Sequence, residues 1–234
     1  MKSKDFLVIL GVILFFSPFY FFESVFNFYK EFNAAHGITM GFVKFAILAT
    51  FGEIVGLRIK TGNYYREGFG LIPRALVWGV LGVSISVAFI IFAKGVPEFL
   101  QYAGLENAVA SMNEPPTITR FIVSFSISAL LNFFFAPVFM IVHKITDTHI
   151  ESHKGKLTAL YSRIDFVNIL KNLDWKVQWN FVFMKTIPFF WIPVHSITFM
   201  LPQEVRILIA AALGIVLGII LAIAALSDEK SEIK

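Results

Sequence analysis

The chain has 234 residues, of which 57% are hydrophobic and only 15% are charged. Soluble domains are about one-half apolar and about one-quarter charged, so this composition excludes an ordinary soluble domain and favours a membrane protein. Cysteine is absent, which excludes a disulfide framework, a thiolate metal site and a cysteine nucleophile. The net charge of +4 is small and its basic residues fall between apolar segments, so nucleic acid is not an expected partner.

Six apolar segments follow one another along the chain, each about as long as a helix that crosses about 30 Å of hydrocarbon. Their hydrophobicity is continuous rather than alternating, which predicts helices rather than the strands of a barrel. We therefore predict an all-α, polytopic membrane helix bundle that forms a single membrane domain over residues 1–234. The predicted spans are residues 6–22, 38–57, 71–92, 118–142, 177–201 and 205–226.

The first span follows a short basic start, so a cleaved signal peptide is the rival interpretation. No small residues suited to cleavage follow it, and the run passes instead into bulky Phe and Tyr. We therefore favour a retained helix that is kinked at Pro18 and extends to about Phe28.

Basic residues between the spans predict the orientation of the chain. Odd-numbered aqueous segments hold most of them: Lys2, Lys4, Arg58, Lys60, Arg66, Arg74, Lys144, Lys154, Lys156, Arg163, Lys171, Lys176, Lys230 and Lys234. Even-numbered segments hold only Lys30, Lys94, Arg120 and Arg206. By the positive-inside rule both termini are cytoplasmic, which suits the plasma membrane of a prokaryote, with an organelle membrane as the alternative.

The longest inner loop, residues 143–176, contains a helical pattern. From Leu157 to Leu170, apolar residues recur every three or four positions, with basic residues on the other side. We predict an amphipathic helix, which either lies along the inner membrane surface or packs against the inner end of the bundle.

Ionisable side chains inside the spans are the candidates for function, because a charge in the bilayer is costly and usually faces protein or water. They are Lys44 and Glu53 in the second span and Lys185 and His195 in the fifth; Asn132 adds an amide in the fourth. One hypothesis is a buried structural ion pair between Glu53 and Lys185. The other is a polar pathway lined by Glu53, Asn132, Lys185 and His195.

Two further patterns concern helix geometry. Pro188 and Pro193 fall within the fifth span and predict a broken helix. Arg74, Arg120 and Arg206 lie near span ends, where we expect them to extend to the membrane interface.

Small residues predict close helix packing. Gly52 and Gly56 in the second span, and Gly214 and Gly218 in the sixth, lie four residues apart. Such spacing allows helix backbones to approach closely in lipid. We expect these faces to contact protein, either in the same chain or in a second copy of it.

Motifs typical of catalysis or metal binding receive little support from the sequence. His149 and His153 are four residues apart in a run that also contains His143, Asp147 and Glu151, but a solvated loop explains this run better than a metal site. Phosphate-binding loops, nucleophile elbows and paired aspartates within a span are not found in the sequence. We predict no enzymatic activity and no cofactor.

Three short stretches resemble the Mpv/PMP-type family of peroxisomal and mitochondrial inner-membrane proteins. Gly52-Glu53-Ile54 is similar to the family's Gly-Asp-Ile, residues 135–139 (FAPVF) to its F-A-P-x-F, and residues 201–206 (LPQEVR) to its turn before the last span. The chain departs from the family at Leu131-Asn132, where the family has Asp-Gln, in lacking the family's Trp-Tyr pair, and in having an additional first span. The resemblance covers roughly residues 42–226 and marks Glu53, Asn132, Pro137, Pro202 and Arg206.

The resemblance implies a small helical membrane protein associated with channel-like permeation of small solutes, without catalytic residues. Together with the ionisable residues, it predicts a channel or transporter-like protein for small polar or ionic solutes. The alternative is a structural or assembly membrane protein whose polar residues only fix helix packing. The lipid bilayer is the expected partner in either case.

Overall fold

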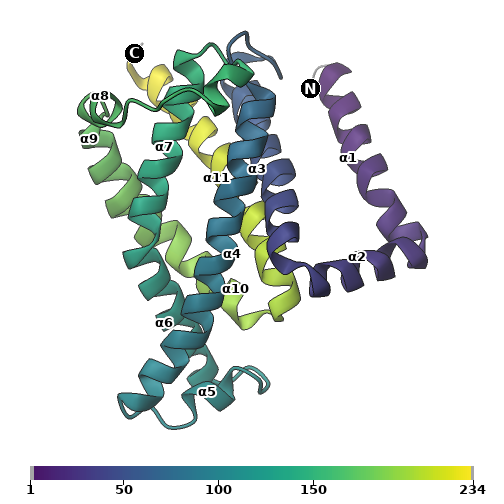
Figure 1. Cartoon of the computed structure of the whole chain (residues 1–234), viewed down its shortest axis with the longest axis vertical. Helices are drawn as coiled ribbons and strands as arrows, with labels where there is room; N and C mark the ends of the chain where they lie inside the picture. The colour runs from purple at the N-terminus through teal and green to yellow at the C-terminus, as the bar shows by residue number, and fades with distance from the viewer. Residues whose placement is uncertain (1–2, 233–234) are drawn as a thin grey trace. The chain divides into compact units, whose positions relative to one another are not determined.

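The computed structural model describes residues 3–232, with side chains described as far as residue 220 (Figure 1). Every regular element in this part of the chain is helical. The chain divides into two compact units, Met1–Met40 and Gly41–Lys234, which we describe separately. The ends of the predicted domain, residues 1–2 and 233–234, lie outside the described residues.

The first unit contains α1 (Ser3–Phe21) and α2 (Glu23–Ala35). Every described residue of α1 remains at least partly exposed, as expected of a helix that faces lipid. Phe22 has an extended backbone that separates the two helices, so the first helix ends at Phe21 rather than near Phe28. The Phe19 and Tyr29 rings meet edge to face at 5.6 Å and join α1 to α2.

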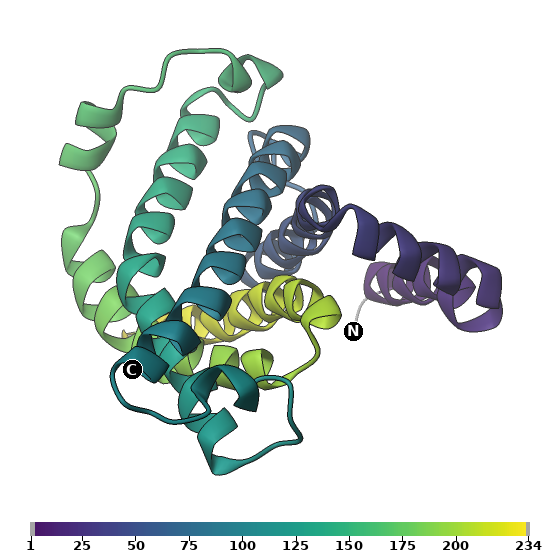
Figure 2. The same ribbon diagram turned by 60° about the horizontal axis from the view of Figure 1, so that its bottom comes forward.

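The second unit is a helix bundle. Its elements are α3 (Gly37–Thr61, which begins in the first unit), α4 (Leu71–Tyr102), α5 (Ala108–Ser111), α6 (Ile118–Phe134), α7 (Ala136–Ser152), η1 (Leu157–Leu160), α8 (Phe166–Lys171), α9 (Trp175–Val177), η2 (Gln178–Trp191), α10 (Ile192–Met200) and α11 (Gln203–Glu232). In Figure 2, α4 lies beside α6 and α7, and residues of α4 contact residues of both helices.

Five helices in the described residues are long and apolar enough to cross a membrane, and the bent pair α6–α7 brings the number up to six. Each of these segments overlaps one of the six predicted spans, although α4 continues to Tyr102 and the bent pair to Ser152, beyond the predicted ends at residues 92 and 142. The all-α membrane bundle predicted from hydropathy is therefore confirmed, and the protein is a multi-pass membrane protein.

Proline accounts for the irregular helices. α6 and α7 meet at a bend of 46°, and Pro137 lies in the first turn of α7, where its missing amide costs no helical hydrogen bond. In the fifth span, η2 is a π-helix that contains Pro188, and α10 begins next to Pro193. The predicted break is thus a change from a wide helix to an α-helix, within one segment long enough to span.

The inner loop differs from the prediction at both ends. α7 continues through His143 to Ser152, so the first part of the predicted loop is helical. The amphipathic helix expected over residues 157–170 is divided into the 3-10 turn η1 and the short helix α8. Asp165 causes the division, because its carboxylate accepts a hydrogen bond from the Asn168 amide at 3.1 Å and so starts a new helix.

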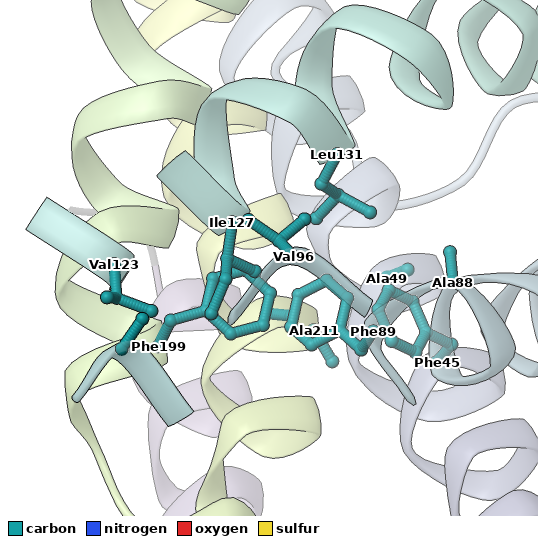
Figure 3. Close-up of a cluster of buried hydrophobic side chains, with 12 residues drawn as sticks. Phe45, Ala49, Ala88, Phe89, Val96, Val123, Ile127, Leu131, Phe199 and Ala211 are labelled. Atoms are coloured by element: carbon teal, nitrogen blue, oxygen red, sulfur yellow. The ribbon is translucent and has the colours of Figure 1, made fainter. Parts of the chain in front are cut away.

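The core of the bundle is formed by α4, α6 and α10 together with Phe45 and Ala49 of α3 and Ala211 of α11 (Figure 3). Phe199, Ile127 and Val123 are completely buried there, and the Phe89 and Phe199 rings are 4.8 Å apart. These residues form an apolar layer that packs against α6 on the N-terminal side of its bend into α7.

Candidate functional site

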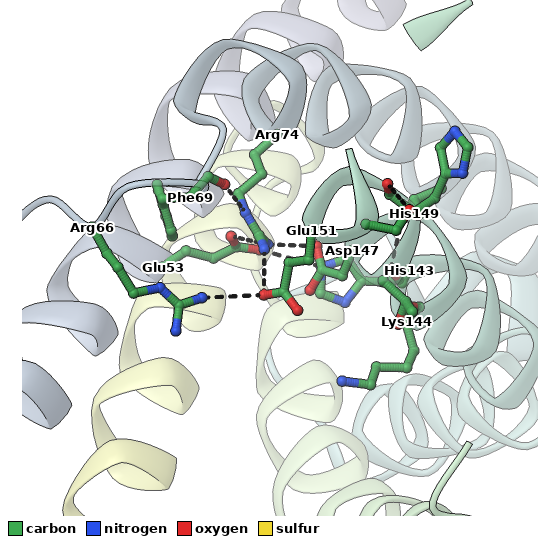
Figure 4. Close-up of polar contacts among 12 residues, drawn as sticks. Glu53, Arg66, Phe69, Arg74, His143, Lys144, Asp147, His149 and Glu151 are labelled. Atoms are coloured by element: carbon green, nitrogen blue, oxygen red, sulfur yellow. Dashed lines mark hydrogen bonds and ion pairs between the residues drawn. The ribbon is translucent and has the colours of Figure 1, made fainter. Parts of the chain in front are cut away.

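A polar cluster joins α3, α4 and α7 at one end of the bundle (Figure 4). Arg74 lies at its centre with a side chain only 5% exposed. Its guanidinium donates to Glu53 at 2.7 Å, Asp147 at 2.6 Å and Glu151 at 3.1 Å, and its Nε donates to the carbonyl of Phe69 at 2.7 Å. Arg74 therefore does not extend to the interface as predicted, because three carboxylates hold it inside the bundle.

A tight turn places Arg74. Gly70 precedes α4 with a φ of 73°, and a side chain there would approach Gly155 at 2.8 Å and Ile150 at 2.7 Å. Only glycine fits this left-handed, crowded position. The turn brings the first residues of α4 against the end of α7, which carries Asp147 and Glu151.

Glu53 has further partners. Its Oε1 accepts from the indole Nε1 of Trp78 at 2.7 Å and lies 3.3 Å from His143 Nε2. His143 Nε2 is also 3.6 Å from Asp147 Oδ2. Both oxygens of Glu53 are thus engaged by protein groups.

A cavity of about 630 Å³ runs from this cluster into the bundle. Its exposed lining residues are Lys60, Thr61, Arg66, Lys144 and Glu151, all at the charged end, which is therefore its mouth. Arg74 and Phe89 both line it, and the 15 positions of α4 between them correspond to about 22 Å of helix. The cavity thus extends well into the thickness of a bilayer.

Asn132 and His195 form the floor of the cavity, and both are buried. Asn132 Nδ2 donates to the Ser128 carbonyl at 2.9 Å and lies 3.2 Å from His195 Nδ1. The same amide nitrogen lies 3.3 Å from Ser128 Oγ. A carbonyl only accepts, so the amide nitrogen faces Ser128, and an Nδ1–H would be directed at the amide hydrogens. Nδ1 is then the acceptor, and neutral His195 carries its proton on Nε2.

The apolar core closes the cavity beyond this floor. The Phe89 ring meets His195 edge to face at 5.4 Å and also contacts Phe199 on its other side. Phe199 and Ile127 are fully buried, so the cavity ends where this apolar layer begins.

One wall of the cavity is formed by α3 and α11. A side chain at Gly52 would lie 3.0 Å from the Ile215 Cα, Gly56 faces the Gly218 carbonyl at 3.7 Å, and Gly218 faces that of Gly52 at 3.4 Å. These three glycines therefore lie where the two backbones approach. Gly214 instead lines the cavity, with open space where a Cβ would be.

The structure brings three of the four predicted pathway residues to one cavity. Glu53 lines its mouth, and Asn132 and His195 its floor. Lys185 is exposed on η2 and is not among the residues that line this cavity. The ion-pair hypothesis is wrong, because the described ion-pair partners of Glu53 are Arg74 and His143. Lys44 is buried within α3 outside the cavity lining.

The candidate metal ligands separate into two groups. His149 Nε2 contacts the Ala159 carbonyl at 3.0 Å and His153 Nδ1 the His149 carbonyl at 2.9 Å, so these nitrogens bind backbone. Glu53, His143 and Asp147 offer ligand atoms within 4.8 Å of one another and form the described group that could hold a cation. Arg74 already neutralises these carboxylates, which weakens their attraction for one.

The other two arginines bind the carbonyls at the end of α10. Arg120 donates to the carbonyls of Met200, at 2.7 Å, and Glu114, while Arg206 donates to those of Leu201 at 2.9 Å and Phe199 at 3.0 Å. Pro202 lies in the turn between α10 and α11. These bonds satisfy carbonyls that a helix end leaves open, so both arginines hold this turn rather than simply extending to the interface.

Three comparisons, with models of protein families, with curated proteins and with solved structures, found no match to this chain. The resemblance to the Mpv/PMP-type family therefore stays a prediction from short motifs.

Proposed function

We propose that this multi-pass membrane protein is a channel or transporter-like protein that passes small polar or ionic solutes through the cavity of its second unit. The cavity itself supports this proposal most strongly: it begins among charged residues at the surface and reaches buried Asn132 and His195. Polar groups inside a bilayer are costly, and a cavity that a solute or water enters offsets that cost.

The closed end of the cavity supports a gated pathway. Phe89 and Phe199 separate the floor from the opposite end of the bundle. Passage of a solute then requires these rings to move apart, while the paired charges of the mouth stay in place. A packed apolar layer between two aqueous regions is also how hydrophobic constrictions gate channels.

A pair of glycine substitutions tests the proposal. Gly214→Phe would place a ring in the cavity, because its Cβ meets open space and the residue lines the cavity. Gly95→Phe is the matched control: Gly95 also lies in a helix with open space at its Cβ, but it is exposed and does not line the cavity.

The measurement is stopped-flow light scattering of proteoliposomes challenged with acetamide, glycerol or potassium chloride. We expect the wild-type protein and Gly95→Phe to accelerate entry of at least one of these solutes over protein-free liposomes, and Gly214→Phe to abolish the increase. Wild-type vesicles as tight as protein-free ones towards all three solutes would contradict transport.

A structural or assembly role is the second candidate, and the bonding of Arg74 favours it. One guanidinium ties α3, α4 and α7 together through Glu53, Asp147 and Glu151. If this is the whole function of the polar residues, Gly214→Phe should leave every measured property except local packing unchanged, and wild-type vesicles should be tight.

The wider setting is part of the same proposal. The charge pattern supports a prokaryotic plasma membrane with both termini in the cytoplasm, and the mouth of the cavity would then open to the cytoplasm. Distant membership of the Mpv/PMP-type family, a non-enzymatic role and self-association through small-residue faces also remain proposals. Crosslinking in native membranes would test the last of these.

A further inference from the structure

The floor of the cavity leaves polar atoms without partners. The bonds of Asn132 and His195 use the amide nitrogen and Nδ1, so His195 Nε2–H and Asn132 Oδ1 bind no described residue. His195 is only 8% exposed, and both residues line the cavity. The indole Nε1 of Trp191, another lining residue, is without a partner too, but unlike those two atoms it is itself buried and does not face the open space. Buried donors of this kind cost free energy until something binds them.

The charges of the cavity lie elsewhere. Its ionisable lining residues other than His195 are Glu53, Lys60, Arg66, Arg74, His143, Lys144, Asp147 and Glu151, which all belong to the mouth. The floor therefore offers the N–H of His195 and the carbonyl of Asn132 but no charge, and an ion there would lack a counter-charge.

Aromatic rings surround the His195 donor. Trp191 lies 5.0 Å from the His195 ring, and Phe89 packs on the ring at 5.4 Å. Phe45 and Phe135 line the cavity between the floor and the mouth. Its volume of about 630 Å³ is that of a site for a small organic molecule, in which apolar walls bind the body and a few polar groups fix its orientation.

We propose that the floor binds the carbonyl oxygen of a small, uncharged organic molecule, such as a ketone or an amide, whose apolar body lies between these rings. His195 Nε2–H donates to the oxygen, and Asn132 fixes the tautomer of His195. This inference rests on the proposed function, since it assigns the solute class of the same cavity.

Two matched probes test the assignment in nanodiscs that contain the full chain. 2-Acetylnaphthalene and 2-ethylnaphthalene share the same ring system and differ by a single carbonyl oxygen. Equilibrium dialysis measures their binding, and nanodiscs with Gly214→Phe, whose cavity is filled, correct for partition into lipid.

We expect the wild-type protein to bind the acetyl probe about 3- to 10-fold more tightly than the ethyl probe, the usual effect of one hydrogen bond. His195→Phe should remove this preference by weakening only the acetyl probe. Asn132→Leu, which releases the tautomer of His195, should reduce the preference for the acetyl probe and is the substitute test if His195→Phe does not fold. Lys185→Met, on the exposed side of η2, should bind both probes like the wild type.

Equal binding of the two probes by the wild-type protein would overturn the inference, as would an equal loss of both in His195→Phe. The two proposals fail separately. Carbonyl-selective binding without flux would refute transport and leave this site, whereas flux of potassium chloride without carbonyl selectivity would refute the site and leave transport.

Discussion

At the mouth of the cavity, Arg74 is satisfied by Glu53, Asp147, Glu151 and a backbone carbonyl. At the floor, the tautomer of His195 is fixed by one neighbour, and its other nitrogen binds no described residue. Both groups are buried and both line one cavity, yet only the first is saturated with partners from the chain. The difference indicates that the mouth holds helices together, whereas the floor is open to a ligand.

The largest effect expected from this comparison is loss of the mouth cluster. Arg74→Met leaves Glu53 and Asp147 partly buried without their counter-charge, while Glu151 remains half exposed to solvent. We expect a loss of about 3 kcal/mol in the free energy of unfolding, typical of breaking a buried ion pair. Denaturant unfolding in detergent micelles measures it.

Arg66→Met is the control for this substitution. The Arg66 side chain is 56% exposed and its Nη2 lies 3.6 Å from Glu151, so this substitution should change stability by less than about 0.5 kcal/mol. Equal effects of the two substitutions would mean that the cluster does not bind the helices together.

A smaller effect is expected at the wall beside the mouth. Gly52→Val places a side chain 3.0 Å from the Ile215 Cα, and α3 and α11 must separate to admit it. We expect a loss of about 2 kcal/mol by overpacking, measured by the same unfolding assay. Gly214→Ala, which meets open space, should be neutral or slightly stabilising, because alanine favours a helix more than glycine does.

The sequence is sufficient to predict the spans and half of the site, for a definite reason. Hydropathy reports burial in lipid directly, so the spans follow from it. Glu53, Asn132 and His195 are conspicuous because a polar group in an apolar segment must face protein or a cavity. Which of them meet depends on the positions of helices in three dimensions, which no local pattern contains.

Lys185 shows how an incorrect helix type misleads. Seven residues are about two turns of an α-helix, so Gln178 and Lys185 would share one face if the fifth span were an α-helix. η2 is a π-helix, whose wider turns need more residues, and the two positions rotate apart: Gln178 is buried and Lys185 is exposed. Nothing in the sequence except Pro188 signals this change.

Arg74 was missed because its place near the end of a span suggested the interface. A signal was present in the spacing of four between His143, Asp147 and Glu151, which lie on one face if the segment is helical. A loop over this segment, as the polar composition predicts, has no such face and therefore hides the partners of Arg74.

At the floor, Asn132→Leu tests the hydrogen bond that fixes His195. The amide loses its bonds to Ser128 and His195 while side-chain volume is kept, and we expect about 1 kcal/mol of destabilisation. The sharper observable is the ring of His195, whose nitrogen-15 shifts should show Nε2–H in the wild type and a mixture of tautomers in the variant. Identical ring shifts in both proteins would show that Asn132 does not orient His195.

The smallest effect is expected at Lys185, which lies in η2, directly before the helix α10 that carries His195. Because it is exposed and outside the cavity, Lys185→Met should change stability by less than about 0.5 kcal/mol and leave flux and probe binding unaltered. By contrast, His195→Phe, which also removes one polar side chain, should abolish the selectivity for the carbonyl probe. A loss of flux in Lys185→Met would return this residue to the pathway and require η2 to turn during transport.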